Sequence, residues 1–305
     1  MKTLVILNPI SGRGRAKRLL PTIQATLRAS GLDFDLLPSE RSWHTAELAE
    51  RAAREGCEAV ITAGGDGTAN EAINGLMRAK ADGCNQTALG MLSIGTGNDF
   101  AASLGLPVKL DKAVNAITQN KRHRIDIGLI KGCDFPEGRY FGNCVGIGFD
   151  AAGTIQARKI AWAKGMLAYL IAVIQTIFWY YKAPTLKIEL ESETINMPSL
   201  MVSIMNGRRI GGGFWTAPEA ILDDGQLDLC IAEEVSRPRM FTFIPHFIKG
   251  TQATQPEIQM KRAKKVKVTA TKGSMPVHID GEIIGEACIE LEVELLPKQL
   301  EIIGF

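Results

Sequence analysis

The sequence lacks a strong excess of charge of either sign. Its 305 residues contain 35 Lys and Arg against 33 Asp and Glu, which leaves a net charge of +2. A protein that binds nucleic acid through its bulk charge is strongly basic, so no nucleic-acid partner is expected. With 46% hydrophobic residues, 31 glycines and 13 prolines, the composition is also too ordinary for a disordered or fibrous protein.

Cysteine is sparse, and the sequence contains no C-x-x-C pair and no His at zinc-finger spacing. The six cysteines are Cys57, Cys84, Cys133, Cys144, Cys230 and Cys288. We expect all of them to be reduced thiols of a cytoplasmic protein. The first apolar run, residues 4–7, stops at Asn8-Pro9 and is too short for the apolar segment of a secretory signal.

Long hydrophobic runs are also missing, with one exception at residues 165–181, where no residue is charged. As a helix this segment would span about 25 Å, which is shorter than the roughly 30 Å hydrocarbon core of a bilayer. The length favours a buried helix. Its Tyr and Trp residues leave two alternatives open, a surface that meets lipid and a true membrane span.

Several common catalytic motifs are absent as well. No Gly-Lys dipeptide occurs, so the chain has no Walker A loop, and no G-x-G-x-x-G follows the first apolar run. The H-E-x-x-H and G-x-S-x-G patterns are also missing. The sequence therefore does not support four classes of enzyme: P-loop NTPases, enzymes with the usual dinucleotide-binding fold, zinc proteases with the H-E-x-x-H motif, and serine hydrolases with the G-x-S-x-G motif.

The two halves of the chain show different hydrophobic patterns. Short apolar runs alternate with helical patterns up to about residue 125, and this alternation is typical of an α/β domain with a parallel sheet. Later, apolar residues alternate singly with charged ones, as at 186–191 and 289–295, which indicates an antiparallel β-sandwich. We predict an α/β domain at 1–127 and a β-rich domain at 128–295, with a cleft between them.

Three glycine-rich turns follow predicted strands of the first half, at residues 8–14, 64–71 and 94–100. The carboxyl ends of parallel strands meet at one edge of a sheet, and the helix N-termini there bind phosphate. Asp66, inside the second turn, would repel a phosphate unless a cation such as Mg²⁺ lay between them. The turns therefore predict a nucleotide site with a metal ion.

Three further segments have two interpretations each. Residues 221–226 contain adjacent acids and are either an ordinary turn or a calcium or magnesium site. Asp280-Gly281-Glu282 is either a plain hairpin turn or a catalytic acid pair. The basic run 261–267 is either a charged strand edge or a surface for anionic lipid head groups.

Together these motifs resemble the diacylglycerol kinase catalytic-domain family, in particular its soluble bacterial lipid kinases. The resemblance rests on N-P-x-S-G at 8–12, G-G-D-G-T-x-N-E at 64–71 and S-x-G-T-x-N-D-F-A at 93–101. More family motifs follow in the same order at 126–128, 143–149, 206–213, 217–220, 223–228 and 280–282.

The resemblance implies an ATP-dependent lipid kinase that transfers the γ-phosphate to a hydroxyl of a membrane lipid, such as diacylglycerol or a related lipid alcohol. It implies a tail at 296–305 that rejoins the first domain. The residues that it implies for ATP are Asn8, Pro9, Ile10, Ser11, Gly12, Ser39, Gly65, Asp66, Gly67, Thr68, Ala69, Asn70, Glu71 and Thr96.

The resemblance also implies a structural Mg²⁺ held by the Asp224 carboxylate and by the backbone carbonyls of Ile221 and Gln226. It gives Asp280 and Glu282 as the catalytic acids, and the sequence leaves open which of the two faces the lipid hydroxyl. The expected partners are ATP, the lipid and the anionic inner face of the membrane, to which the protein would bind peripherally. The number of copies is open, with a homodimer as one alternative.

Two other functions fit the glycine-rich turns. One is a kinase of a soluble substrate, such as NAD or a sugar phosphate, and the other is a nucleotide-binding module without catalysis. The D-G-E turn and the D-D-G-x-L-D segment at 223–228 favour the lipid kinase over both.

Overall fold

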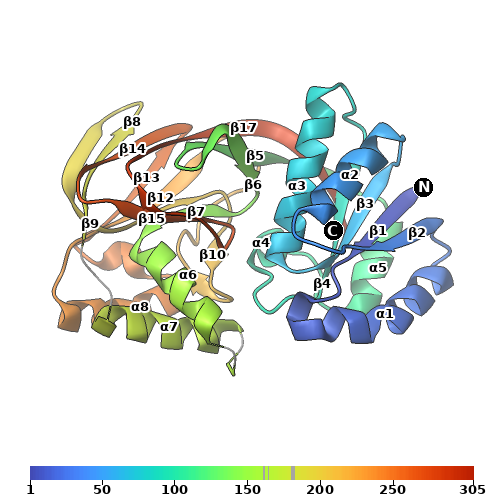
Figure 1. The fold of residues 1–305 in the computed structure, drawn as a ribbon, viewed down its shortest axis with the longest axis horizontal. Helices are drawn as coiled ribbons and strands as arrows, with labels where there is room; N and C mark the ends of the chain where they lie inside the picture. The colour runs from blue at the N-terminus through green and yellow to red at the C-terminus, as the bar shows by residue number, and fades with distance from the viewer. Residues whose placement is uncertain (161, 164, 180–182) are drawn as a thin grey trace. The chain divides into compact units, whose positions relative to one another are not determined.

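The computed structural model describes residues 1–160, 162–163, 165–179 and 183–305 (Figure 1). The chain divides into two compact units, which we call the first and the second domain. The first domain contains residues 1–127 and 297–305, and the second contains residues 128–296.

The first domain is built on a parallel sheet with strand order β4-β3-β1-β2. Its strands are β1 (Thr3–Leu7), β2 (Phe34–Pro38), β3 (Ala59–Gly64) and β4 (Ala88–Ser93). The end of β17 (Glu290–Ile303) adds a further parallel strand, in which Ile302 pairs with Leu89. The strands β1 and β3 are buried along their whole length, and this explains why they are continuous apolar runs in the sequence.

Five helices accompany this sheet: α1 (Ser11–Ala29), α2 (His44–Arg54), α3 (Asp66–Ala81), α4 (Asp99–Ser103) and α5 (Leu110–Thr118). The start of α1 is irregular, because Gly12, Arg13 and Gly14 have φ angles of 58°, 58° and 79°. Three successive left-handed residues cannot form a regular α-helix. The predicted turn at 8–14 therefore extends into the first residues of α1.

The second domain is an antiparallel β-sandwich. One sheet has the order β16-β15-β7-β9-β12-β13, and β8, β14, β17, β5 and β6 continue from the other half of β9. Its strands are β5 (Arg122–Gly132), β6 (Phe135–Phe141), β7 (Cys144–Gly148), β8 (Thr185–Leu190), β9 (Thr194–Met205), β12 (Leu227–Glu233), β13 (Ile258–Ala263), β14 (Lys265–Lys272), β15 (Met275–Ile279) and β16 (Glu282–Cys288). The short strands β10 (Arg209–Ile210) and β11 (Phe214–Trp215) form a separate pair. The predicted fold class is confirmed.

Apolar side chains fill the space between the two sheets of the sandwich, among them Val145, Val202, Val268 and Val293. A second apolar cluster lies against three helices, α6 (Phe149–Lys159), α7 (Gly165–Trp179) and α8 (Arg237–Lys249), with a 3₁₀ turn at Gln252–Thr254 (Figure 1). The long apolar segment of the sequence thus forms α7. Tyr180 and Tyr181 of that segment lie outside the described residues.

One face of α7 is buried and the other is exposed. Ala172 and Ile177 are inaccessible to solvent, whereas Leu167 and Phe178 are more than half exposed. None of the described helices is both long enough and apolar enough to cross a membrane.

The expectation of six reduced thiols is wrong for one pair. Cys133, in the turn between β5 and β6, forms a disulfide with Cys288 at the end of β16. Their Cα atoms lie 5.1 Å apart although 155 positions separate them in the sequence. The strand pairing of the sandwich brings them together, and sequence spacing alone contains no sign of it.

Candidate active site

The glycine-rich turns of the first domain pack backbone against backbone. A Cβ atom on Gly95 would lie 2.5 Å from the Cα of Gly65, and one on Gly12 would lie 2.4 Å from the carbonyl oxygen of Ile94. Such distances are far shorter than any ordinary contact of a methyl group, so these positions require glycine. The three turns are therefore brought together at the carboxyl ends of β1, β3 and β4, as the sequence predicts.

Polar side chains join these turns. The amide of Asn8 donates a hydrogen bond to the hydroxyl of Thr68 at 3.0 Å, and the hydroxyl of Ser11 lies 3.4 Å from the same oxygen. Ser39 is held nearby, because its N–H donates to the carbonyl of Leu7 at 2.8 Å. The arrangement gathers hydroxyl and amide groups around the start of α3.

The N-terminus of α3 supplies the positive end of a helix dipole. Its first intrahelical bond runs from the N–H of Ala69 to the carbonyl of Gly65, so the N–H groups of the preceding residues have no partner within the helix. Asp66 lies at this point, and its Oδ1 accepts the N–H of Phe100 in α4 at 3.0 Å. The site combines N–H donors that attract an anion with a carboxylate that attracts a cation.

Not every residue implied for ATP lies at this surface. Ala69 and Asn70 are buried within α3, and the side chain of Glu71 accepts the N–H of Thr45 at 3.1 Å at the start of α2. Glu71 therefore acts as a cap of α2. In contrast, Ile10 is 78% exposed, and Thr96 and Gly67 are exposed as well.

In the second domain, Asp280 is bound by backbone groups. Its carboxylate accepts the N–H groups of Gly142, Asn143 and Cys144 at distances of 3.0, 3.1 and 2.8 Å. Asp280 and Gly281 have φ angles of 46° and 82°, as in a two-residue type I′ hairpin turn between β15 and β16. Three backbone donors around one carboxylate hold Asp280 in place.

Glu282, two residues later, has a different environment. Its Oε2 lies 2.6 Å from the guanidinium of Arg139, which is itself buried, while the Glu282 side chain is 36% exposed. The carboxylate of Glu282 is therefore paired with a cation, whereas that of Asp280 accepts backbone N–H groups. The structure thus distinguishes two acids that the sequence leaves equivalent.

The acidic turn at 221–226 has a cation partner within the protein. Oδ1 of Asp224 accepts the N–H of Gln226 at 3.0 Å, and its Oδ2 forms an ion pair with Arg262. Asp228, on β12, is buried, and its Oδ2 has no hydrogen-bond partner among the residues that the structure describes. Burial raises the pKa of this carboxyl, so a bound cation would relieve an unfavourable charge.

Oxygen donors of this kind suit Mg²⁺, and the orphaned oxygen of Asp228 is compatible with an ion in this turn. Within the described ranges, however, no three Asp, Glu, His or Cys side chains converge on a common metal position. An ion here would therefore depend on the backbone carbonyls of Ile221 and Gln226 beside the Asp224 carboxylate.

The basic run at 261–267 is largely neutralised. Lys261 lies 2.8 Å from Glu193, and Lys267 lies 3.0 Å from Glu290. Lys265 lies 3.5 Å from Glu292, and Arg262 pairs with Asp224 as described above. These pairs favour the interpretation of the run as a charged strand edge.

Apolar side chains of the second domain line a small, partly open cavity of about 60 Å³, which we call the apolar cavity. Helix α7 contributes Tyr169, Val173 and Ile177, and helix α8 contributes Met240, Phe243 and Phe247. Asp150 is the one charged residue among those that line it in the described part of the chain. The composition of the lining suits a hydrocarbon chain.

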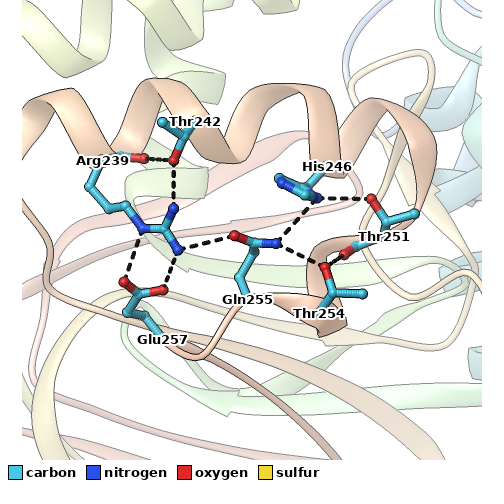
Figure 2. Close-up of polar contacts among 7 residues, drawn as sticks. All are labelled: Arg239, Thr242, His246, Thr251, Thr254, Gln255 and Glu257. Atoms are coloured by element: carbon cyan, nitrogen blue, oxygen red, sulfur yellow. Dashed lines mark hydrogen bonds and ion pairs between the residues drawn. The ribbon is translucent and has the colours of Figure 1, made fainter.

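One wall of this cavity is anchored by polar contacts (Figure 2). Arg239, at the start of α8, forms a bidentate pair with Glu257 at 3.0 and 2.7 Å and also donates to Gln255. The side chain of Gln255 lies 3.4 Å from His246, which contacts Thr251 at 2.9 Å. These contacts fix α8 to the segment that leads into β13.

Three features of the site were missed by the sequence analysis. Arg13 lies between two left-handed glycines of the first turn, and the G-R-G-R pattern could have indicated it as a phosphate partner. Asp150 follows Gly148-Phe149 in an otherwise apolar stretch, a position where an acid is unusual. Helix α8 has no clear helical pattern, because Pro238 and Pro245 interrupt it.

The fold and the turns define a two-domain enzyme of the kinase class, and comparison with known proteins identifies its family. Residues 2–130 match the model described as the diacylglycerol kinase catalytic domain. Residues 143–304 match the YegS C-terminal NAD kinase beta sandwich-like domain. The chain belongs to the diacylglycerol kinase catalytic-domain family.

Curated relatives extend over nearly the whole chain. The chain is 29% identical to a diacylglycerol kinase of Mycobacterium tuberculosis, covering 99% of this chain and 94% of the relative. It is also 29% identical to a diacylglycerol kinase of Staphylococcus saprophyticus, covering 92% of this chain and 89% of that protein.

Two solved structures have the same fold. A diacylglycerol kinase from Bacillus anthracis superimposes with a TM-score of 0.74 at 22% identity, covering 100% of this chain and 97% of that one. A yeast NADH kinase in complex with NADH superimposes with a TM-score of 0.51 at 10% identity, covering 100% of this chain and 84% of that one.

The two acids of the D-G-E turn should respond differently to removal of their charge. Asp280→Asn should lower the melting temperature, because each hydrogen bond to a charged group contributes about 1.5–3 kcal/mol and three are weakened. Glu282→Gln keeps a hydrogen bond from Arg139 and should be destabilised less than Asp280→Asn, but it should lose about 10²- to 10⁴-fold in kcat if Glu282 is the general base. Calorimetry and a phosphoryl-transfer assay on both variants check this. Equal melting temperatures for the two would contradict the division of roles.

Proposed function

We propose that the protein transfers the γ-phosphate of ATP to a hydroxyl of a membrane lipid, whose acyl chain lies in the apolar cavity of the second domain. The observation that carries this proposal is the lining of that cavity, which is apolar except for Asp150, Tyr169 and Thr216. Diacylglycerol or a related lipid alcohol fits such a lining. NAD and sugar phosphates carry phosphates and many hydroxyls, which would be left without partners there.

The nucleotide end of the reaction belongs to the first domain. Backbone N–H groups at the start of α3 and the hydroxyl of Ser11 are suited to bind and orient the triphosphate. The carboxylate of Asp66 fits a divalent cation beside these anion donors, and Mg²⁺ bound there would neutralise charge on the phosphate oxygens. Arg13 adds a positive charge to the first turn.

The acceptor end belongs to the D-G-E turn. As the lipid oxygen bonds to the γ-phosphorus and the bond from phosphorus to the ADP oxygen breaks, Glu282 takes the hydroxyl proton. Asp280 keeps the turn in place by accepting the N–H groups of residues 142–144. Arg139 orients the carboxylate of Glu282 from the buried side.

Asp66→Asn should lower kcat about 100-fold, because it removes the charge that we assign to the metal at the triphosphate. The change is isosteric, and an Asn oxygen can still accept the N–H of Phe100, so the melting temperature should stay the same. Steady-state kinetics and calorimetry on the purified variant measure both effects. Activity above about a tenth of the wild type would mean that Asp66 only links α3 to α4.

A structural Mg²⁺ in the turn at 221–226 should raise the melting temperature of the wild type relative to EDTA. At a hundredfold excess over Kd the ion contributes about 2.7 kcal/mol, or about 5–10 °C for a domain of this size. Asp224→Ala should abolish this response, and Asp223→Ala, in the same turn, is the matched control. If the wild type melts at one temperature in Mg²⁺ and in EDTA, Asp224 holds no ion, and its role is limited to its contacts with Arg262 and Gln226.

The apolar cavity is tested by filling it. Val173→Trp places a large side chain into the cavity from α7, whereas Leu167→Trp places the same side chain on the exposed face of that helix. Radiolabelled ATP is supplied with a total lipid extract, with NAD or with sugar phosphates, and the products are separated. We expect a labelled lipid from the wild type and from Leu167→Trp, and about tenfold less from Val173→Trp.

A labelled NAD or sugar phosphate with no labelled lipid would favour the second candidate function, a kinase of a soluble substrate. The likeness of the fold to yeast NADH kinase supports that candidate. A protein that binds ATP and labels no acceptor would be a nucleotide-binding module.

We further infer that the protein binds a membrane peripherally through the outer face of α7. The basic run at 261–267 is a weaker candidate for this contact, because its side chains are paired within the protein. Leu167 and Phe178 are 55% and 58% exposed, Trp162 is 75% exposed, and Lys159 lies nearby in the sequence. Exposed apolar groups beside positive charge suit the surface of an anionic bilayer.

The variant Leu167→Glu with Phe178→Glu should bind phosphatidylglycerol vesicles at least about tenfold more weakly, since each side chain buried in lipid contributes about 1.5–3 kcal/mol. Gln119→Glu adds a charge to an exposed position of the first domain rather than of α7, and should bind like the wild type in a flotation assay. Equal binding of all three proteins would exclude α7 as the contact.

A further inference from the structure

A buried acid at one end of the apolar cavity has no part in the proposed chemistry. Asp150, in the first turn of α6, is 3% exposed. Its Oδ1 accepts the hydroxyl of Tyr169 at 2.8 Å, and its Oδ2 accepts the hydroxyl of Ser203 at 2.7 Å. The Nε2 atom of His278 lies 3.2 Å from Oδ1. Three different elements thus meet at one carboxylate.

The protonation states follow from these contacts. Burial opposes the charge on Asp150, but His278 and the hydrogen bonds from Ser203 and Tyr169 outweigh it and lower its pKa. Burial, followed by the charge of Asp150, raises the pKa of Tyr169 well above its usual value, so Tyr169 keeps its proton and donates it.

His278 connects this acid to the D-G-E turn. It lies on β15, two residues before Asp280, and its Nδ1 accepts the N–H of Gly281 at 3.3 Å. The ring therefore lies between the D-G-E turn and Asp150, with Nε2 on the side of the acid. The space around the ring is tight, because a Cβ atom on Gly146 would lie 2.2 Å from Nε2 of His278 and 2.4 Å from Oδ2 of Asp150.

Tyr169 connects the same acid to the wall of the cavity. Its ring lines the cavity from α7 and packs edge-on against Phe214, with the ring centroids 5.2 Å apart. A Cβ atom on Gly211 would lie 2.4 Å from the ring. A molecule in the cavity would therefore press on a side chain whose hydroxyl is bound to Asp150.

We propose that Tyr169, Asp150 and His278 are positioning residues, which transmit the filling of the apolar cavity to the D-G-E turn and so to Glu282. The inference rests on the proposed function, in which an acyl chain fills that cavity. Its physical basis is the sensitivity of catalysis to position, since a displacement of about 1 Å can lower a rate about 100-fold.

Stability alone is a weak explanation of this cluster. Replacing buried hydrogen-bonded polar groups by apolar residues of the same shape can be neutral or stabilising, so such a cluster is poor evidence of a purely structural role. The continuity from cavity wall to catalytic turn is the feature that a structural role does not require.

The test compares Tyr169→Phe with Ser203→Ala. Each removes one hydroxyl from Asp150, but only Tyr169 lies in the proposed connection between α7 and the turn. Two variants of His278 each keep one contact of the ring. The amide of His278→Gln can still reach Asp150 but not the N–H of Gly281. The side-chain oxygen of His278→Asn can accept the N–H of Gly281 but does not reach Asp150. His246→Gln, in the anchor of α8, is the remote control.

The first measurement is kcat for butanoyl, hexanoyl, octanoyl and decanoyl diacylglycerols in mixed micelles at saturating ATP. In the wild type and in Ser203→Ala, kcat should rise about tenfold as the chains become long enough to fill the cavity. In Tyr169→Phe and His278→Gln it should stay near the value for the shortest chain, with an unchanged KM for ATP. His278→Asn, which loses the contact with Asp150, should lose the dependence as well.

The second measurement needs no substrate. Hydrogen exchange of the peptide that spans residues 279–284 should be about fivefold faster in Tyr169→Phe and His278→Gln than in the wild type, Ser203→Ala and His246→Gln. Circular dichroism shows whether each variant is folded. If Tyr169→Phe does not fold, the two His278 variants, each compared with the wild type, test the proposed connection in its place.

The outcomes separate the two proposals. If the wild type phosphorylates no diacylglycerol but exchange responds as expected, the proposed acceptor is wrong and the connection stands. If Tyr169→Phe keeps the dependence of kcat on chain length, and its exchange equals that of Ser203→Ala, the connection is wrong and the lipid kinase stands.

Discussion

The chemistry of the second domain depends on the hydrogen bonds that the Asp280 carboxylate accepts from three backbone N–H groups. The groups belong to residues 142–144, which join β6 to β7, so the carboxylate ties the hairpin of β15 and β16 to the neighbouring strand. Buried N–H groups without a partner would each cost about 1–3 kcal/mol. The turn is therefore fixed by the backbone itself. Glu282 on one side of it and His278 on the other have defined positions as a result.

The two domains supply different parts of the proposed reaction. In the first, glycine allows the turns after β1, β3 and β4 to approach closely, which places backbone donors and Asp66 at one edge of a parallel sheet. In the second, helices α7 and α8 cover an apolar cavity, with α8 anchored through Arg239 and α7 bound through Tyr169. An apolar cavity with one acid at its end suits a molecule that is mostly hydrocarbon. This is the physical basis for a lipid acceptor.

Much of the first domain could be predicted from the sequence, because local rules determine it. Parallel strands are continuous apolar runs, and glycine at 65 and 95 reflects a close approach that no other residue allows. The left-handed turn within α1 was not predicted, since Arg13 adopts a conformation that is rare for a side chain of its size.

The second domain depends on contacts between distant positions, and sequence patterns record these poorly. The disulfide between Cys133 and Cys288, the ion pair of Glu282 with Arg139 and the cluster around Asp150 each join separate strands. Alternation of apolar and charged residues predicts a sandwich without its register. For that reason the sequence could name Asp280 and Glu282 but not assign a separate role to each.

The position of the acyl chain tests the account most directly. A diacylglycerol with a diazirine on one acyl chain can be crosslinked to the protein by light, and the labelled peptides can be identified by mass spectrometry. The account predicts labels on α7 and α8, on residues that line the apolar cavity such as Val173 and Phe243, and competition by unlabelled diacylglycerol. Labels confined to residues outside this cavity, with the same competition, would contradict it.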